Sequence, residues 1–86
     1  SILTHFEKLG VNDLDNIKKS LLENGITDVQ MESVLGGMIR MLSSMKSDPN
    51  RFILNSRIKK YFRDNCGLNS NQIDYIEKLS MQIIQQ

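Results

Sequence analysis

The chain has 86 residues, of which 40% are hydrophobic and 24% are charged, with five Gly and one Pro. A chain of this size has surface for one core only, so we expect a single folded domain over residues 1–86 and not a disordered tail. One Cys and one His exclude a disulfide framework and a zinc scaffold. No apolar run approaches the length of about 18 residues that spans a membrane, so we expect a soluble, cytoplasmic protein.

The net charge of +1 conceals an uneven distribution along the chain. Residues 1–34 carry three Lys/Arg and six Asp/Glu, for a charge of −3, whereas residues 35–67 carry seven and two, for +5. Residues 68–86 carry one and two, for −1. The acidic and basic parts could pair within the fold, pair between two copies, or present a basic face to an acidic partner.

Three of the glycines predict where helices end. Each of the three is followed by an apolar residue and then by a polar residue that can cap the next helix. The three instances are Gly10-Val11-Asn12, Gly25-Ile26-Thr27 and Gly67-Leu68-Asn69. Gln follows the second and third caps after three residues, as in a capping box, and Asp48-Pro49 predicts a further helix start. The glycine spacings of 15 and then 42 residues are too irregular for a structural repeat, so we interpret them as boundaries only.

The apolar residues recur with a helical period throughout, which predicts an all-α fold of four or five helices. The expected helices are a short one from the N-terminus to Leu9, then about 13–24, 28–46, 49–65 and 70–84. The third helix carries an apolar stripe that is too wide for one neighbour. We therefore expect a homodimer, such as a dimeric bundle, or a fold that depends on a partner. The methionines of this helix favour a core over an adaptable binding groove.

Gly36 and Gly37 lie inside the third helix, where each costs about 1 kcal/mol relative to Ala. We expect a close helix contact to compensate, within the fold or across a dimer, at a set of five residues: Gly36, Gly37, Met38, Arg40 and Met41. The alternative is that the third helix breaks at the two glycines. A phosphate-binding loop is disfavoured, since no strand precedes the pair and no Lys-Ser/Thr follows it.

A basic cluster on the fourth helix is the candidate partner-binding surface. It consists of Arg51, Arg57, Lys59, Lys60 and Arg63, with Tyr61 and Phe62 interleaved. Spacing places Lys59, Lys60 and Arg63 on one side of the helix, where they form either a docking face or merely a solvated one. Nucleic acid is the less favoured partner, because the net charge is small and the helices after the turns begin with acidic residues.

No set of residues predicts catalysis. His5 has no candidate partner in the sequence, and Cys66 lies at a predicted helix end, where nothing favours its thiolate. We therefore expect no enzyme, no cofactor and no metal site.

The segment Glu32-Ser33-Val34-Leu35-Gly36, followed by Ile39, Leu42, Ile53-Leu54 and Ile58, resembles the central pattern of the YmgB/AriR-type biofilm and acid-resistance regulators. The resemblance covers about residues 25–84 with a one-residue gap near Ser47 to Pro49. The chain departs from the pattern at Pro49, at Gly37 and in its basic fourth helix. The resemblance implies a dimeric, non-enzymatic helical protein that modulates a transcriptional regulator.

The sequence thus favours a regulatory protein-protein interaction module, an adaptor or modulator whose partner is another protein with an acidic surface. Two alternatives remain open. One is a nucleic-acid-binding module that uses the basic fourth helix, and the other is a small helical immunity or inhibitor protein. None of these requires a membrane.

Overall fold

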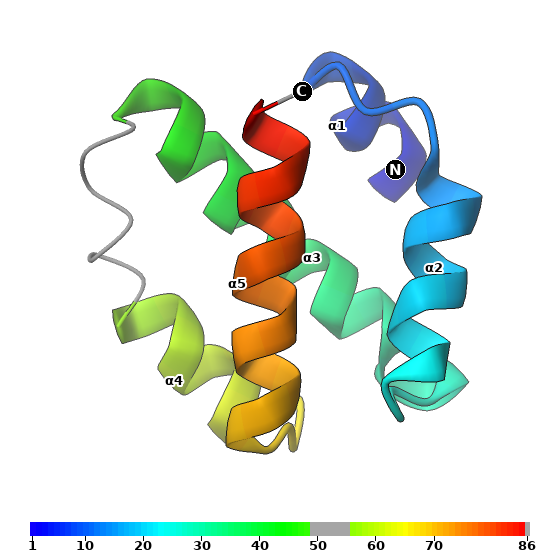
Figure 1. Ribbon diagram of the computed structural model, residues 1–86, viewed down its shortest axis with the longest axis vertical. Helices are drawn as coiled ribbons and strands as arrows, with labels where there is room; N and C mark the ends of the chain where they lie inside the picture. Colours follow the sequence, from blue (N-terminus) through cyan, green and yellow to red (C-terminus); the bar gives the residue numbers. More distant parts are fainter. Residues whose placement is uncertain (49–55, 86) are drawn as a thin grey trace.

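The computed structural model describes residues 1–48 and 56–85, and these form five helices and no strand. The helices are α1 (Ile2–Lys8), α2 (Leu14–Glu23), α3 (Asp28–Ser47), α4 (Ser56–Asp64) and α5 (Ser70–Gln85). The predicted all-α fold is confirmed. α3 and α5 cross at the centre of the molecule, with α2 and α4 on opposite sides of them (Figure 1). The helix start predicted at Pro49 lies outside the described residues.

The predicted glycine boundaries are confirmed. Gly10, Gly25 and Gly67 have φ of 81°, 82° and 71°, a left-handed conformation that few other residues adopt. Thr27 and Gln30 form the expected capping box at the start of α3. At the start of α5, the Gln72 backbone N–H donates to Asn69 Oδ1 over 2.9 Å, and the Asn69 N–H donates to Gln72 Oε1 over 3.0 Å. The start of both helices is therefore fixed by local hydrogen bonds.

The apolar stripe of α3 is covered within a single chain, by α1, α4 and α5 among others. Its buried residues are Met31, Val34, Leu35, Met38, Met41, Leu42 and Met45. Phe6, Leu21, Phe62 and Ile76 bring one fully buried side chain from each of the other four helices into the same core. The width of the stripe reflects these several neighbours and does not by itself require a second copy. None of the helices that the structure describes has the length and hydrophobicity needed to cross a membrane.

α3 continues through the glycine pair, so the alternative of a break there is excluded. The close contact at Gly37 lies within the fold. A Cβ at this position would come within 2.5 Å of Phe62 Cε1 and 3.0 Å of Tyr61 Cε2. The missing side chain is what allows the rings of α4 to rest on the backbone of α3. At Gly36, by contrast, a Cβ would meet nothing within 4 Å.

The α2–α3 and α4–α5 hairpins repeat one another. Ile17-Lys18-Lys19 in α2 matches Ile58-Lys59-Lys60 in α4, and one extra residue, Cys66, precedes the second glycine. From Gly25 and Gly67 onward, each residue of the first hairpin corresponds to the residue 42 positions later in the second. The two capping boxes correspond in this way. The interpretation as boundaries only is therefore wrong for Gly25 and Gly67. They occupy equivalent positions of the repeat. The irregular spacing arises because Gly10 follows α1, which stands outside the repeat.

The contacts between the two hairpins are reciprocal. Gln30 Nε2 donates to the carbonyl of Cys66 over 2.8 Å, and its counterpart Gln72 donates to that of Asn24 over 3.1 Å. Each accepting carbonyl belongs to the residue just before the turn glycine of the other hairpin.

A second reciprocal pair joins the outer helices to the central ones. The hydroxyl groups of Ser20 and Tyr75 are hydrogen-bonded, and the Tyr61 hydroxyl donates to the Ser33 carbonyl over 2.9 Å. Under the repeat, Ser20 corresponds to Tyr61, and Ser33 to Tyr75. Reciprocity of this kind is the signature of a two-fold relation, so the hairpins are related by an approximate two-fold axis.

Candidate interaction surfaces

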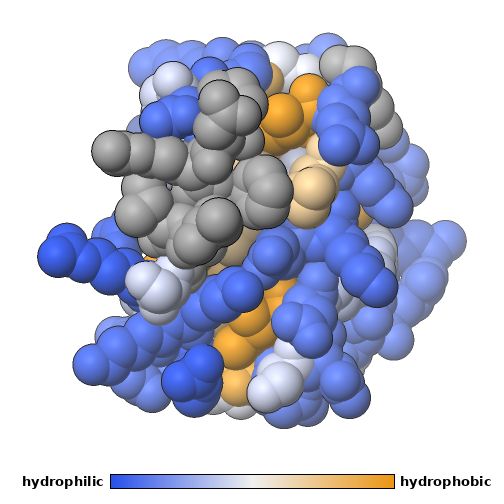
Figure 2. Space-filling model, turned by 60° about the vertical axis from the view of Figure 1, so that its left-hand side comes forward, coloured by the Kyte–Doolittle hydropathy of each residue, from blue (hydrophilic) through white to orange (hydrophobic). Residues whose placement is uncertain are grey.

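The exposed side of α4 carries most of the predicted basic cluster. Arg57, Lys60 and Arg63 are exposed, and none of them has an ion pair within residues 1–48 and 56–85. Figure 2 shows this side of the molecule, where hydrophilic side chains predominate. Arg51, the remaining upstream member, lies outside the described residues.

Lys59 differs from the other cations of α4. Its Nζ lies 2.9 Å from Glu77 Oε2, so this lysine bridges α4 and α5. Sequence spacing groups Lys59 with Lys60 and Arg63, but it cannot reveal a carboxylate on the neighbouring helix. Of the predicted cluster, Arg57, Lys60 and Arg63 are thus the exposed cations that have no ion pair among the described residues.

The opposite side of α4 is anchored to α3. Phe62 is fully buried, and the ring of Tyr61 meets it edge to face, with ring centroids 5.8 Å apart. The Arg40 guanidinium stands over the Tyr61 ring, 5.3 Å from its centroid, in a cation–π contact. Both rings pack on the backbone at Gly37. This packing determines which side of α4 faces the core, and so leaves the opposite side of the helix toward solvent.

Burial raises the pKa of the Tyr61 phenol, and the neighbouring Cys66 raises it further. Burial also raises the pKa of the Cys66 thiol. Both groups therefore stay protonated at neutral pH. Tyr61 remains a hydrogen-bond donor to α3, and Cys66 is held as a thiol and not as the nucleophilic thiolate.

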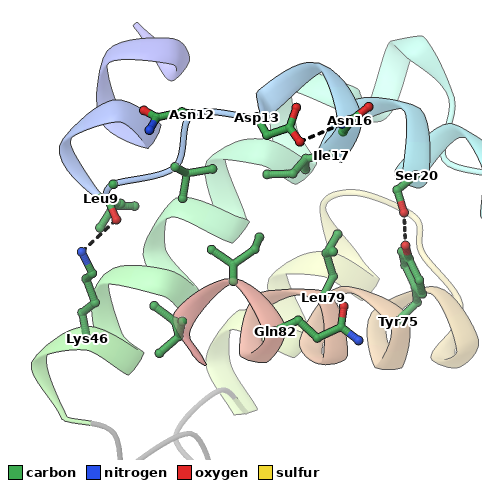
Figure 3. A pocket seen from close by; sticks show the side chains of 14 residues that line it. Leu9, Asn12, Asp13, Asn16, Ile17, Ser20, Lys46, Tyr75, Leu79 and Gln82 are labelled. Atoms are coloured by element: carbon green, nitrogen blue, oxygen red, sulfur yellow. Dashed lines mark hydrogen bonds between the residues drawn. The ribbon is translucent and has the colours of Figure 1, made fainter. Parts of the chain in front are cut away.

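A groove of about 710 Å³ separates α2 from α5 (Figure 3). Ile17 of α2 and Leu79 of α5 line it, and the Ser20–Tyr75 hydrogen bond bridges it at one end. At the other end, Lys46 Nζ donates to the Leu9 carbonyl over 2.8 Å.

The repeat explains why this groove stays open. Under the two-fold relation, the equivalent space lies between α4 and α3, and there Gly37 lets the aromatic rings close it. The counterpart of Gly37 on α5 is Leu79, whose side chain lines the groove. The closed side combines Gly37 with the ring of Tyr61, and the open side has Leu79 and Ser20 at the corresponding positions.

The other residues predicted at a helix contact or dimer are placed as follows. Met38 and Met41 are fully buried within the single chain, so they pack against other helices of the fold. Arg40 is exposed and contacts Tyr61, as described above. Sequence reasoning missed Ser20, Tyr75 and Leu79, which only the recognition of the repeat would have singled out.

No group of three or more His, Cys, Asp or Glu side chains in the described part of the chain is arranged to hold a metal ion. Comparisons with models of protein families, with curated proteins and with solved structures found no significant match to this chain.

Proposed function

We propose that this chain is a non-enzymatic regulatory protein-protein interaction module that binds an acidic surface of another protein through α4. The observation that supports the proposal is the state of Arg57, Lys60 and Arg63. All three are exposed and without an ion pair among the described residues, on a helix whose other side is anchored to the core. A rigid helix with unpaired cations suits an acidic partner, because such charges raise the association rate and select against other basic surfaces.

The resemblance to the YmgB/AriR-type regulators suggests a transcriptional regulator as the partner. Nucleic acid is a weaker candidate for the same surface. Acidic side chains follow both inter-helix turns, Asp28 and Glu32 on α3 and Asp74 and Glu77 on α5, and would repel phosphates. The net charge of +1 also leaves little of the electrostatic attraction on which such binding depends.

The experiment is a comparative affinity purification from the native host with two matched variants. In one, Arg57, Lys60 and Arg63 are changed to Gln. In the control, the three exposed lysines Lys8, Lys19 and Lys78 are changed to Gln, which alters the net charge equally.

We expect a partner protein to co-purify with the unmodified chain and the control, and to be lost from the α4 variant. Retention of the same partner by all three proteins, with unchanged circular dichroism spectra, would show that α4 is not the binding surface.

A further inference from the structure

Two exposed leucines lie in a second groove, on the side of the molecule formed by α1, α2 and the first half of α3. Among the described residues the exposed large hydrophobics are Leu3, Leu22 and Val29, and the first two line this groove. Leu3 is 53% exposed and Leu22 is 46% exposed. The groove has a volume of about 540 Å³. Leu3 and Leu22 therefore expose apolar surface together in one groove and are not scattered singly.

The groove is lined by three helices, α1, α2 and α3. Leu14, Met31 and Leu35 line it as buried members of the core, whereas Leu3 and Leu22 are exposed to solvent. α2, which provides one wall, has 10 residues and is therefore about 15 Å long. This length suits an amphipathic helix of roughly three turns, whose apolar side chains at positions i, i+3 or i+4 and i+7 enter such grooves.

The repeat shows that the fold does not require an apolar residue at this place. The counterpart of Leu22 in the other hairpin is Arg63, which is exposed. The counterpart of Leu35 is Glu77, which pairs with Lys59. The same surface is thus polar in one hairpin and apolar in the other, so the exposure of Leu22 is not a consequence of how the hairpin folds.

The charges at the groove indicate the kind of partner. Asp28 and Glu32 line it from α3, both are exposed, and neither has an ion pair within the described residues. They are four residues apart, so two like charges face the same side of the helix and repel each other slightly until a cation approaches. Lys18 contributes a single cation from the α2 side.

We propose that this groove binds a basic amphipathic helix of a partner protein, with its apolar side chains against Leu3 and Leu22 and its cations near Asp28 and Glu32. This surface is distinct from the basic side of α4, and the proposal does not depend on the function proposed for that helix. The two surfaces together would let one chain hold an acidic and a basic partner at the same time.

The test uses a fluorescent peptide of about 14 residues, long enough to span α2, in which Leu and Lys alternate with helical period. Two control peptides have the same pattern with Glu in place of Lys, or the same composition in scrambled order. Anisotropy titrations are made at physiological salt with the full chain. We expect saturable one-to-one binding of the basic amphipathic peptide only.

Two substitutions in the groove should weaken this binding. We expect a loss of about tenfold for Leu22→Gln and of about two- to fivefold for Glu32→Gln, because an ion pair at an exposed carboxylate is weak. Glu23→Gln removes an exposed carboxylate of α2 outside the groove and should leave the affinity unchanged, as should the triple α4 variant. Circular dichroism confirms that each variant is folded, and the triple variant separates this proposal from the one made for α4.

Three results would overturn the proposal. The first is the absence of saturable binding, and the second is equal binding of either control peptide. The third is a dimer in sedimentation equilibrium that dissociates on Leu22→Gln, since a second copy would then occupy the groove.

Discussion

Gly36 and Gly37 are adjacent in the sequence, but the first borders open space and the second is in contact with aromatic rings. A methyl group at Gly36 would meet nothing, so Gly36→Ala should stabilise the protein by up to about 1 kcal/mol through helix propensity alone. A methyl group at Gly37 would overlap the buried Phe62 ring, so Gly37→Ala should destabilise by about 1–3 kcal/mol despite the same gain.

Urea unfolding of the two variants measures this difference directly. Equal effects of the same sign would mean that α4 does not rest on α3 at Gly37.

Ser80 is fully buried, and its hydroxyl has no hydrogen-bond partner among the described residues. Its counterpart in the repeat is the fully buried Met38, so the position belongs to the core in both hairpins. Ser80→Ala removes an unsatisfied polar group and should leave stability unchanged or raise it by up to about 1 kcal/mol. Ser20→Ala removes a partnered hydroxyl and should cost about 1 kcal/mol. Thermal unfolding of both variants checks the contrast, and a marked loss for Ser80→Ala would reveal a partner for this hydroxyl.

At the scale of the helices, the capping boxes do more than start α3 and α5. Thr27→Ala should cost about 1 kcal/mol, because one backbone N–H at the start of α3 loses its acceptor. Gln30→Ala should cost more, since Gln30 serves the cap with its Oε1 and joins the other hairpin through Nε2. Urea denaturation of the two variants and their double mutant tests this order. If Gln30→Ala cost no more than Thr27→Ala, the link between hairpins would contribute nothing to stability.

The sequence was sufficient for the presence of the helices and for the limits marked by Gly10, Gly25 and Gly67, because these depend on local signals. Thr27 with Gln30 and Asn69 with Gln72 are each complete within four residues. The interaction surfaces were predicted only in part, because they depend on residues brought together from distant segments. Glu77, which engages Lys59, is one example.

Other features were missed for the same reason. The α2–α5 groove is one example. Leu79 lines it from α5, at the position that corresponds to Gly37 of α3. The repeat itself was obscured by the extra Cys66 and by the different charges of α2 and α4.

At the scale of the whole molecule, the charge distribution predicts a weak affinity for nucleic acid. At about 150 mM salt we expect no submicromolar binding of the unmodified chain to duplex DNA or to RNA. The three cations of α4 that have no ion pair among the described residues neutralise too few phosphates. Anisotropy with labelled duplexes over a range of salt concentrations measures it. Binding with a log-log slope of about −0.9 for each phosphate contact, reduced by about one unit when Arg57, Lys60 or Arg63 is removed, would favour the nucleic-acid reading instead.

The approximate two-fold relation makes the chain comparable to a dimer whose subunits have been tied together at residues 49–55. The hydrogen bonds that run between the hairpins, Gln30 to Cys66 and Gln72 to Asn24, do not require a covalent connection. Peptides 1–48 and 56–86 should therefore recover helical circular dichroism when mixed, and much less when separate. Two intact chains could exchange hairpins in the same way. The resulting dimer would be held together by the same contact that joins the two hairpins within one chain.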